Sequence, residues 1–404
     1  MKNQHLKQPP NDTDVWILAG QSNMEGVGEL AYALPPSEDV YSFTSAGNWE
    51  IAAEPLHRFW ESFTPVHQLL IRPGLPEHRR HMTDAQLAEL ETVERKYGAG
   101  LGMSFGKTLA SLTHRHIGLI PCAHGGTSLA QWNPDLKSQG GASLYGAMLE
   151  RINRCGRKPK GLLWYQGESE GWSIESGQKW GADFETWIAR LRADLDQPHF
   201  PVLVVQIGRT TIDTAVVRAW NAVQLGQYAL RDRVDHVAMT SAIDLPLVDC
   251  IHLNAAGLKR LGNRLARMAA ALISGTPGNQ IGPRLKRAIQ RPEPPDRVLI
   301  DLSFTGVTGA WQPADHIAGF DVMDADGNPH RINHVINAFR NPADPTSILV
   351  RLNIALQPGE TVTYGHGLRP YCNAVDEADF PLCASTITLE PTTGATGTEK
   401  GQTL

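Results

Sequence analysis

The sequence predicts an α/β protein, a three-layer α/β/α sandwich around a parallel sheet, followed by a smaller all-β domain. Between residues 14 and 275, short apolar runs alternate with longer segments of helical period, which is typical of a parallel sheet. Beyond residue 297 the helical period disappears and only short strand-like runs follow. The length of 404 residues also favours more than one domain.

The expected α/β domain spans residues 14–275 and is flavodoxin-like, with five strands and five helices. Its apolar and β-branched strand runs are 15–19, 117–123, 161–165, 202–207 and 234–240. Apolar residues recur three and four positions apart in the segments between them, which are 101–112, 142–155, 182–195, 215–230 and 254–273.

Residues 32–98 interrupt this alternation with Trp-, Pro- and His-rich sequence and a predicted helix at 83–97. Long excursions of this kind are commonly lids or binding loops. We interpret the segment as an insertion over the active face. An appendage that only packs against the domain is the alternative.

The C-terminal part is predicted to be an antiparallel β-sandwich over 298–389. Its strand runs are 298–304, 316–322, 330–338, 347–353 and 360–364, with a hairpin turn at 324–329. Asp324, Asp326 and Gly327 resemble the start of a calcium loop, but the later ligands are missing and a turn is the better interpretation. Pro, Gly and basic residues predict a linker at 276–297, and composition predicts a flexible segment at 1–13 and a disordered tail at 390–404.

Bulk properties exclude several classes of partner. The net charge of -5 and pI of about 6.3 argue against nucleic acid and anionic membranes. No apolar run approaches the roughly 18 residues of a membrane span, and no secretory signal is visible, so we expect a cytoplasmic protein, or a secreted or periplasmic one if a leader was removed. Five cysteines at unrelated spacings indicate reduced thiols, with a Cys372–Cys383 bridge as an alternative after export.

A serine follows the first predicted strand directly. The strand ends in Ala19-Gly20-Gln21-Ser22, which places Ser22 beyond the carboxyl end of a central parallel strand, where open α/β sheets bind ligands. Gly20 permits a tight turn there. Ser22 is the candidate nucleophile, with Gln21 and Asn23 as supporting neighbours.

Two other strand ends supply hydrogen-bond donors at the same edge. His124-Gly125-Gly126 follows the second strand and Gln166-Gly167-Glu168 the third. Bare glycine backbone and a side-chain amide are the donor types that an oxyanion hole requires. Glu168 is expected to hold Gln166 or the nucleophile turn in place.

Asp249 and His252 stand three positions apart, just before the last helix of this domain. With the carboxylate on one imidazole nitrogen, the other nitrogen is free to accept the proton of Ser22. These residue types therefore predict a Ser-His-Asp triad.

GQSNM at 20–24, HGGTS at 124–128, WYQGES at 164–169 and DCIH at 249–252 together resemble the blocks of SGNH hydrolases. The resemblance is strongest to the sialate O-acetylesterase and acetylxylan-esterase branch, in which a Gln from a WYQGE-like block replaces an Asn. It implies a serine esterase that removes O-acetyl groups from a carbohydrate through an acetyl-enzyme, without metal or organic cofactor. The implied oxyanion hole is the Ser22 N–H, the N–H of Gly125 or Gly126, and the Gln166 side chain.

Ser169 is a competing nucleophile because Gly167 to Gly171 matches the G-x-S-x-G elbow of α/β-hydrolases. Such an elbow enters a helix at once, whereas 171–181 is predicted to be a polar loop, so Ser22 is favoured. Asp196 and His199 repeat the D-x-x-H spacing but precede a strand, at the opposite edge of the sheet. The histidines 78, 81, 114 and 116 match no zinc motif and are expected on the surface.

Two tryptophans are candidate substrate contacts. Trp132 and Trp172 are candidates for stacking on a sugar ring. Two other functions stay open: a glycan-binding protein on an inactive esterase scaffold, and a lipid or thioester hydrolase. The β domain either extends the glycan cleft, supports the catalytic domain or mediates homo-oligomerisation.

Overall fold

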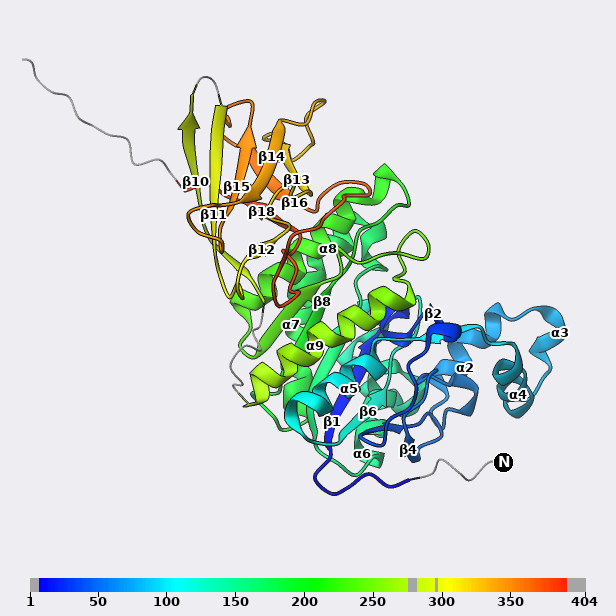
Figure 1. Cartoon of the computed structure of the whole chain (residues 1–404). Coiled ribbons are helices and arrows are strands. Elements are labelled where there is room, and N and C mark those ends of the chain that lie inside the picture. Colours follow the sequence, from blue (N-terminus) through cyan, green and yellow to red (C-terminus); the bar gives the residue numbers. More distant parts are fainter. Residues whose placement is uncertain (1–6, 275–281, 295–296, 391–404) are drawn as a thin grey trace, which may run out of the picture.

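The computed structural model of the chain describes residues 7–274, 282–294 and 297–390 (Figure 1). In these ranges an α/β domain carries a separate β domain at one end. The α/β domain has one central sheet, in the order β4-β3-β6-β1-β7-β8-β9. Its strands are β1 (Asp14–Gly20), β3 (Val40–Phe43), β4 (Trp49–Ile51), β6 (Ile117–Pro121), β7 (Pro159–Tyr165), β8 (Val202–Gln206) and β9 (Val237–Ser241).

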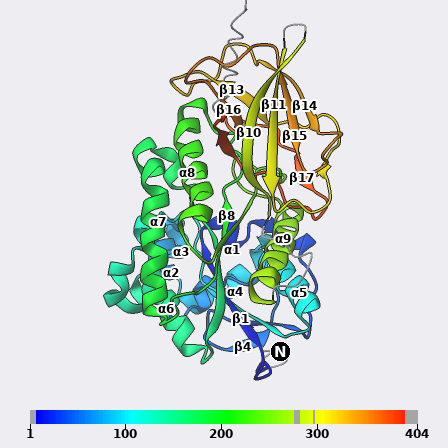
Figure 2. The same ribbon diagram turned by 90° about the vertical axis from the view of Figure 1, so that its left-hand side faces the viewer.

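Helices cover both faces of this sheet, as the rotated view shows (Figure 2). One layer contains α5 (Gly102–Thr113) and α9 (Ala255–Ser274). The other contains α6 (Leu144–Arg154), α7 (Ile174–Asp194) and α8 (Thr214–Arg233). The predicted three-layer α/β/α architecture is confirmed. None of the helices in the described ranges is long and apolar enough to cross a membrane.

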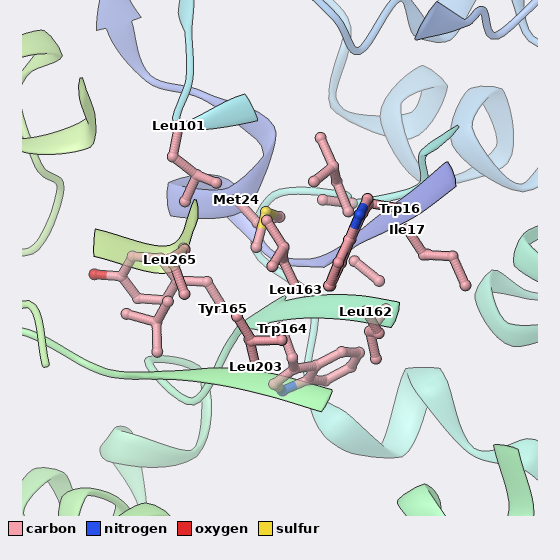
Figure 3. Packing of buried hydrophobic residues seen from close by; sticks show 14 of the residues in the cluster. Trp16, Ile17, Met24, Leu101, Leu162, Leu163, Trp164, Tyr165, Leu203 and Leu265 are labelled. Atoms are coloured by element: carbon pink, nitrogen blue, oxygen red, sulfur yellow. The ribbon is translucent and has the colours of Figure 1, made fainter. Parts of the chain in front are cut away.

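Most residues of the central strands are buried because both faces of the sheet are covered. Trp16 and Ile17 of β1 and the run Leu162 to Tyr165 of β7 are fully buried and pack against one another (Figure 3). β1 pairs in parallel with β6 on one side and β7 on the other. The ends of these three strands therefore meet at one edge, where the predicted site residues lie.

The segment 32–98 is more than an insertion over the active face. It supplies β3, which pairs in parallel with β6, and β4, which closes the sheet edge in antiparallel pairing. All four residues of β3 are buried, so this stretch belongs to the core. The rest forms α2 (Val66–Ile71), α3 (Glu77–Arg80) and α4 (Asp84–Glu94), on the right of Figure 1.

Short elements complete the α/β domain. The nucleophile turn opens α1 (Ser22–Glu25), and β2 (Gly28–Glu29) pairs with β5 (Tyr97–Ala99). The 3-10 turns are η1 (Leu30–Tyr32), η2 (Phe59–Glu61), η3 (Arg72–Gly74), η4 (Leu129–Trp132), η5 (Pro134–Ala142) and η6 (Glu170–Trp172).

The C-terminal domain contains antiparallel sheets around a core of its own, as predicted. One sheet has the order β10-β11-β15-β14, and a second has the order β13-β16-β18. Their bounds are β10 (Arg284–Glu293), β11 (Arg297–Thr305), β13 (Phe320–Met323), β14 (Val335–Arg340), β15 (Ile348–Leu352), β16 (Thr361–Tyr364) and β18 (Ser385–Ile387), with β12 (Trp311–Gln312) paired to β17 (Val375–Asp376). Asp324 begins a tight turn, in which it accepts from the Gly327 N–H.

The predicted linker at 276–297 is wrong for its described residues. β10 occupies Arg284–Glu293 and pairs along its length with β11. Only Ala288 of β10 is buried. The other residues of this strand include several charged side chains, which give the segment the composition of a linker. The expected disordered tail falls almost entirely outside the described residues.

The last described segment returns to the α/β domain. Phe380 and Cys383 are buried in the core of that domain. The Gln206 side chain accepts from the Ala384 N–H at 2.8 Å and donates to the Ala384 carbonyl at 2.9 Å. Residues near the end of the predicted domain 298–389 thus complete the packing of the first domain.

Residues 7–13 are held against the domain, which contradicts the expected flexibility of this part. The Arg157 guanidinium donates to the carbonyls of Pro9 and Pro10 at 2.7 and 2.8 Å. All five cysteines are free thiols, so the alternative Cys372–Cys383 bridge is not formed.

Candidate active site

Ser22 lies at the carboxyl end of β1 because the chain turns sharply after Gly20. Gly20 has a φ of +135°, and a Cβ at this position would lie 2.1 Å from the Tyr165 carbonyl oxygen. Only glycine fits so close to the neighbouring strand. The Gln21 N–H then donates to the same Tyr165 oxygen at 2.9 Å, and Ser22 begins α1.

Ser22, His252 and Asp249 are brought together as a hydrogen-bonded chain. Ser22 Oγ lies 2.8 Å from His252 Nε2, and His252 Nδ1 lies 2.7 Å from Asp249 Oδ2. The second oxygen of Asp249 accepts from the N–H groups of Ile251 and His252 at 2.9 and 2.8 Å. With Nδ1–H donating to Asp249, Nε2 is left to accept the Ser22 proton.

The pKa of Asp249 is lowered from its ordinary value. Burial pushes this pKa upward, but the hydrogen bonds from the Ile251 N–H, the imidazole and the His252 N–H outweigh it. The carboxylate therefore stays ionised at neutral pH and orients the imidazole.

Asn23 clamps the loop that carries His252. Its Oδ1 accepts from the Leu253 N–H at 3.0 Å, and its Nδ2 donates to the Ile251 carbonyl at 3.2 Å and to Glu168 at 2.7 Å. Both residues that flank His252 in sequence are thus fixed by the residue that follows Ser22. Burial raises the pKa of Glu168 to about 7, and the hydrogen bond from Asn23 opposes this shift.

Gln166 does not take the predicted place in an oxyanion hole. Its amide is fully buried, and Nε2 donates to the Thr127 carbonyl at 3.2 Å and to the Glu170 carboxylate. Oε1 accepts from the Trp180 indole N–H at 2.9 Å. Both amide hydrogens are already used inside the protein, so the structure contradicts this part of the prediction.

Gln21, which directly precedes Ser22, directs its side-chain amide toward the loop after β7. Its Oε1 accepts from the N–H and hydroxyl of Ser169, both at 3.3 Å, and from the Gly167 N–H at 3.4 Å. Within the described residues its Nε2 donates to no acceptor. Ser169 therefore serves as a support for Gln21, and since its hydroxyl contacts no imidazole, it lacks the base that a nucleophile needs.

The two glycines after β6 differ in environment. Gly125 N–H donates to Glu25 Oε2 at 2.8 Å, whereas Gly126 is exposed. Burial raises the pKa of Glu25 to about 7, and the nearby Arg95 guanidinium and the Gly125 N–H oppose the shift. Sequence reasoning missed Glu25, although its position directly after the GQSNM motif and one helical turn from Ser22 was a signal.

His57 and Arg95 were also missed, and the sequence around them carries no signal. His57 Nδ1 lies 2.9 Å from the Glu25 carbonyl oxygen, and its Nε2 accepts from the Ala123 N–H at 3.2 Å. Burial lowers the pKa of His57 to about 3, so the imidazole is neutral and donates through Nδ1. Both residues come from the irregular segment 32–98, far from Ser22 in sequence.

The two candidate tryptophans have different environments. Trp132 is fully buried, its indole N–H donates to Thr127 Oγ1 at 3.1 Å, and its ring packs edge-on against Trp164. It is a core residue and cannot stack on a sugar, so this prediction is wrong. Trp172 is 58% exposed at the end of η6 and stays a candidate.

The remaining histidine alternatives find no catalytic partner. His199 packs its ring against His236 at the amino end of β8, away from Ser22. Among the described residues, no group of three or more His, Cys, Asp or Glu is arranged to hold a metal ion, and His78, His81, His114 and His116 belong to no such group.

A cavity of about 690 Å³ lies beside the loop that carries Asp249 and His252, although none of Ser22, Asp249 and His252 lines it. One wall follows α1 in the chain and includes Glu29 and Tyr32. The other flanks Asp249 and His252 and includes Val248, Asn254 and Lys259. Tyr32 is 70% exposed. The size is usual for small-molecule sites.

A hydrogen-bonded Ser-His-Asp chain at the carboxyl edge of a parallel sheet is an arrangement typical of serine hydrolases with an α/β/α fold. Residues 12–271 match the model of a family described as carbohydrate esterase, sialic acid-specific acetylesterase. The chain belongs to this family of carbohydrate esterases, which are hydrolases of ester bonds.

Individual proteins agree with this assignment. The chain is 29% identical over 283 residues to a probable carbohydrate esterase of Arabidopsis thaliana, covering 64% of this chain and 90% of the relative. A carbohydrate acetylesterase from Xanthomonas citri has a similar fold, with a TM-score of 0.64 at 20% identity over 93% of this chain and 80% of its own. The latter likeness includes the β domain.

Proposed function

We propose that the protein removes O-acetyl groups from a carbohydrate through an acetyl-enzyme on Ser22. The observation that carries the proposal is the chain from Ser22 Oγ through His252 to Asp249, with distances of 2.8 and 2.7 Å. Family membership supports the esterase chemistry and the carbohydrate substrate.

The proposed reaction has two halves. Ser22 Oγ attacks the acetyl carbonyl carbon while His252 Nε2 accepts the hydroxyl proton. The tetrahedral intermediate then expels the sugar oxygen, which receives that proton, and leaves acetyl-Ser22. A water molecule attacks the acetyl group with His252 again as base, which releases acetate and restores the Ser22 hydroxyl.

Donors around Ser22 would stabilise the oxyanion of the intermediate. The Ser22 N–H, at the first position of α1, has no acceptor within the described residues. The Gln21 amide replaces Gln166 as the side-chain donor, because its oxygen is fixed by Ser169 and its nitrogen is unpaired in the described structure. Each such donor is worth about 3 kcal/mol in the transition state.

The cavity beside the loop of Asp249 and His252 is the proposed binding site of a sugar unit. The exposed ring of Tyr32 offers a stacking face, and Glu29, Asn254 and Lys259 offer hydrogen-bonding groups for hydroxyls. Tyr32→Ala is expected to lower kcat/KM for an acetylated xylo-oligosaccharide by about tenfold and to leave p-nitrophenyl acetate hydrolysis within about twofold of native. Equal effects on both substrates would contradict the proposal that the sugar unit binds in this cavity.

The test of the proposal compares the native protein, Ser22→Ala and Ser169→Ala on p-nitrophenyl acetate and an acetylated xylo-oligosaccharide. We expect Ser22→Ala to abolish acetate release and Ser169→Ala to retain most of it. Loss of activity in Ser169→Ala alone would support the elbow alternative. A native protein inert on both esters would favour the glycan-binding alternative, and faster cleavage of octanoyl than acetyl esters would favour a lipid or thioester hydrolase.

A further inference from the structure

Gly125 is packed against the nucleophile turn and its N–H is already paired. The N–H donates to Glu25 Oε2 at 2.8 Å. A Cβ built on Gly125 would lie 3.0 Å from that oxygen and 3.5 Å from the Ser22 Cβ. This glycine therefore lies next to the reacting serine, but it donates to Glu25.

Gly126 has the properties that Gly125 lacks. It is exposed with a φ of +69°, and a Cβ built on it would meet no atom within 4 Å. Within the described residues the Gly126 N–H donates to no acceptor. An oxyanion hole needs a fixed donor that no protein group has taken. In the loop after β6, Gly126 meets that requirement.

Residues of the segment 32–98 hold Glu25 in place. The His57 imidazole bridges the Glu25 carbonyl oxygen and the Ala123 N–H, so it ties α1 to the start of the loop. Arg95 lies 3.7 Å from Glu25 Oε1, and its Nη1 donates to the His57 carbonyl at 2.8 Å. The side chains of Glu25 and Arg95 are 17% and 14% exposed, so the pair is only slightly open to water.

We propose that Glu25 is a positioning residue that holds the loop after β6 so that the Gly126 N–H faces the oxyanion formed on Ser22. His57 and Arg95 secure Glu25 in that position. This inference rests on the proposed acetyl transfer at Ser22. The inference also gives the segment 32–98 a function other than that of a lid. Through His57 and Arg95 this segment supports the loop after β6.

The experiment compares Glu25→Ala and Glu25→Gln with Glu54→Gln. Glu54 is a matched control, since burial raises its pKa to about 7 too and it accepts from backbone N–H groups, those of Gly100 and Leu34. Hydrolysis of p-nitrophenyl acetate is measured at about pH 8, where the Glu25 carboxyl is ionised. Phenylboronic acid serves as an analogue of the tetrahedral intermediate, and the thermal midpoint of each variant is recorded.

We expect Glu25→Ala to lower kcat by about 10- to 100-fold while KM stays within about twofold of native. The affinity for phenylboronic acid is expected to fall by a factor similar to that for kcat. Glu25→Gln keeps an oxygen for the Gly125 N–H and is expected to recover most of this loss. Glu54→Gln is expected to have the native kcat, KM and affinity for phenylboronic acid. If Glu25→Ala does not fold, Arg95→Met is expected to show the same pattern at about 3- to 10-fold.

Three results would overturn the inference. Native kcat in Glu25→Ala would show that the contact is catalytically irrelevant, and a raised kcat would show that Glu25 instead masks a Gly125 donor. An equal loss in Glu54→Gln would show a general effect of buried carboxyl groups. Undiminished hydrolysis by Ser22→Ala would instead refute the proposed function itself, so the two failures are distinguishable.

Discussion

The Asn23 amide donates to the Glu168 carboxylate across 2.7 Å, and through this bond the ends of β1 and β7 jointly support the loop of His252. Asn23 contacts both neighbours of His252 in the chain, Ile251 and Leu253. The position of His252, the proposed base, therefore depends on the side chain of the residue that follows Ser22, the proposed nucleophile.

We predict that Asn23→Ala lowers kcat by about 100-fold and changes KM little, because the imidazole loses its fixed distance to Ser22. Steady-state kinetics on p-nitrophenyl acetate measures this. The control is Asn328→Ala, in an exposed turn of the β domain, and its kcat and KM should equal those of the native protein. A kcat of Asn23→Ala within about twofold of native would exclude the clamp.

Trp132 and Trp172 are predicted to differ in their contribution to the free energy of unfolding. Trp132→Ala is expected to lower the free energy of unfolding by about 3–5 kcal/mol, because it empties a fully buried site. Trp172→Ala is expected to change it by less than about 0.5 kcal/mol. Denaturant titration of both variants checks this, and a stable Trp132→Ala would contradict the core assignment.

Glu54 is predicted to make stability depend on pH. Burial raises its pKa from 4.5 to about 7, so the folded state holds this proton more tightly than the unfolded state. The associated stability is complete below about pH 4.5 and is lost as the pH rises through about 7. Relative to the native protein, Glu54→Gln should gain up to about 3 kcal/mol between these limits.

Thermal or denaturant unfolding of both proteins at about pH 5 and pH 8 measures this difference. Taking the difference cancels the contribution of the buried histidines, whose pKa values are lowered by burial and which act in the opposite direction. A difference that is equal at the two pH values would show that Glu54 is not buried as described.

Arg264 is predicted to hold the end of the chain on the catalytic domain. Its fully buried guanidinium donates to Asp244 at 2.6 Å and to Asp379 at 3.1 Å. Arg264→Met would remove the buried cation that both carboxylates share and is expected to cost about 3–5 kcal/mol. Arg260 contacts the same carboxylates but is 40% exposed, so Arg260→Met should cost less than about 1 kcal/mol. Equal costs in urea titrations would refute the distinction.

The meeting of Ser22, Asp249 and His252 was predictable because each lies at or beyond the carboxyl end of a strand, and parallel strands end at one edge. Gln166 also lies there, but its direction depends on Glu170 and on Trp180 of α7. Hydrophobic periodicity does not predict which group an amide side chain will form a hydrogen bond with. The sequence therefore located this residue without indicating its contacts.

Sequence reasoning missed β10, which has one buried residue, as well as β3, which is buried throughout. β10 exposes most of its charged side chains, and its pairing with β11 is a backbone interaction that leaves little trace in composition. The start of α7 at Ile174 fell in a predicted polar loop because glycines and polar residues mask the period. Ser173, whose side chain accepts from the Ser176 N–H as a helix cap, was the overlooked signal.

The bonds between Gln206 and Ala384 join residues 178 positions apart. During synthesis the ribosome makes the whole triad long before it makes this closing segment. Until then Gln206 lacks its bonds to Ala384 and Phe380 is missing from the core, so the α/β domain emerges incompletely packed. The packing of the α/β domain is thereby completed only when the segment that contains Phe380 and Ala384 has been made.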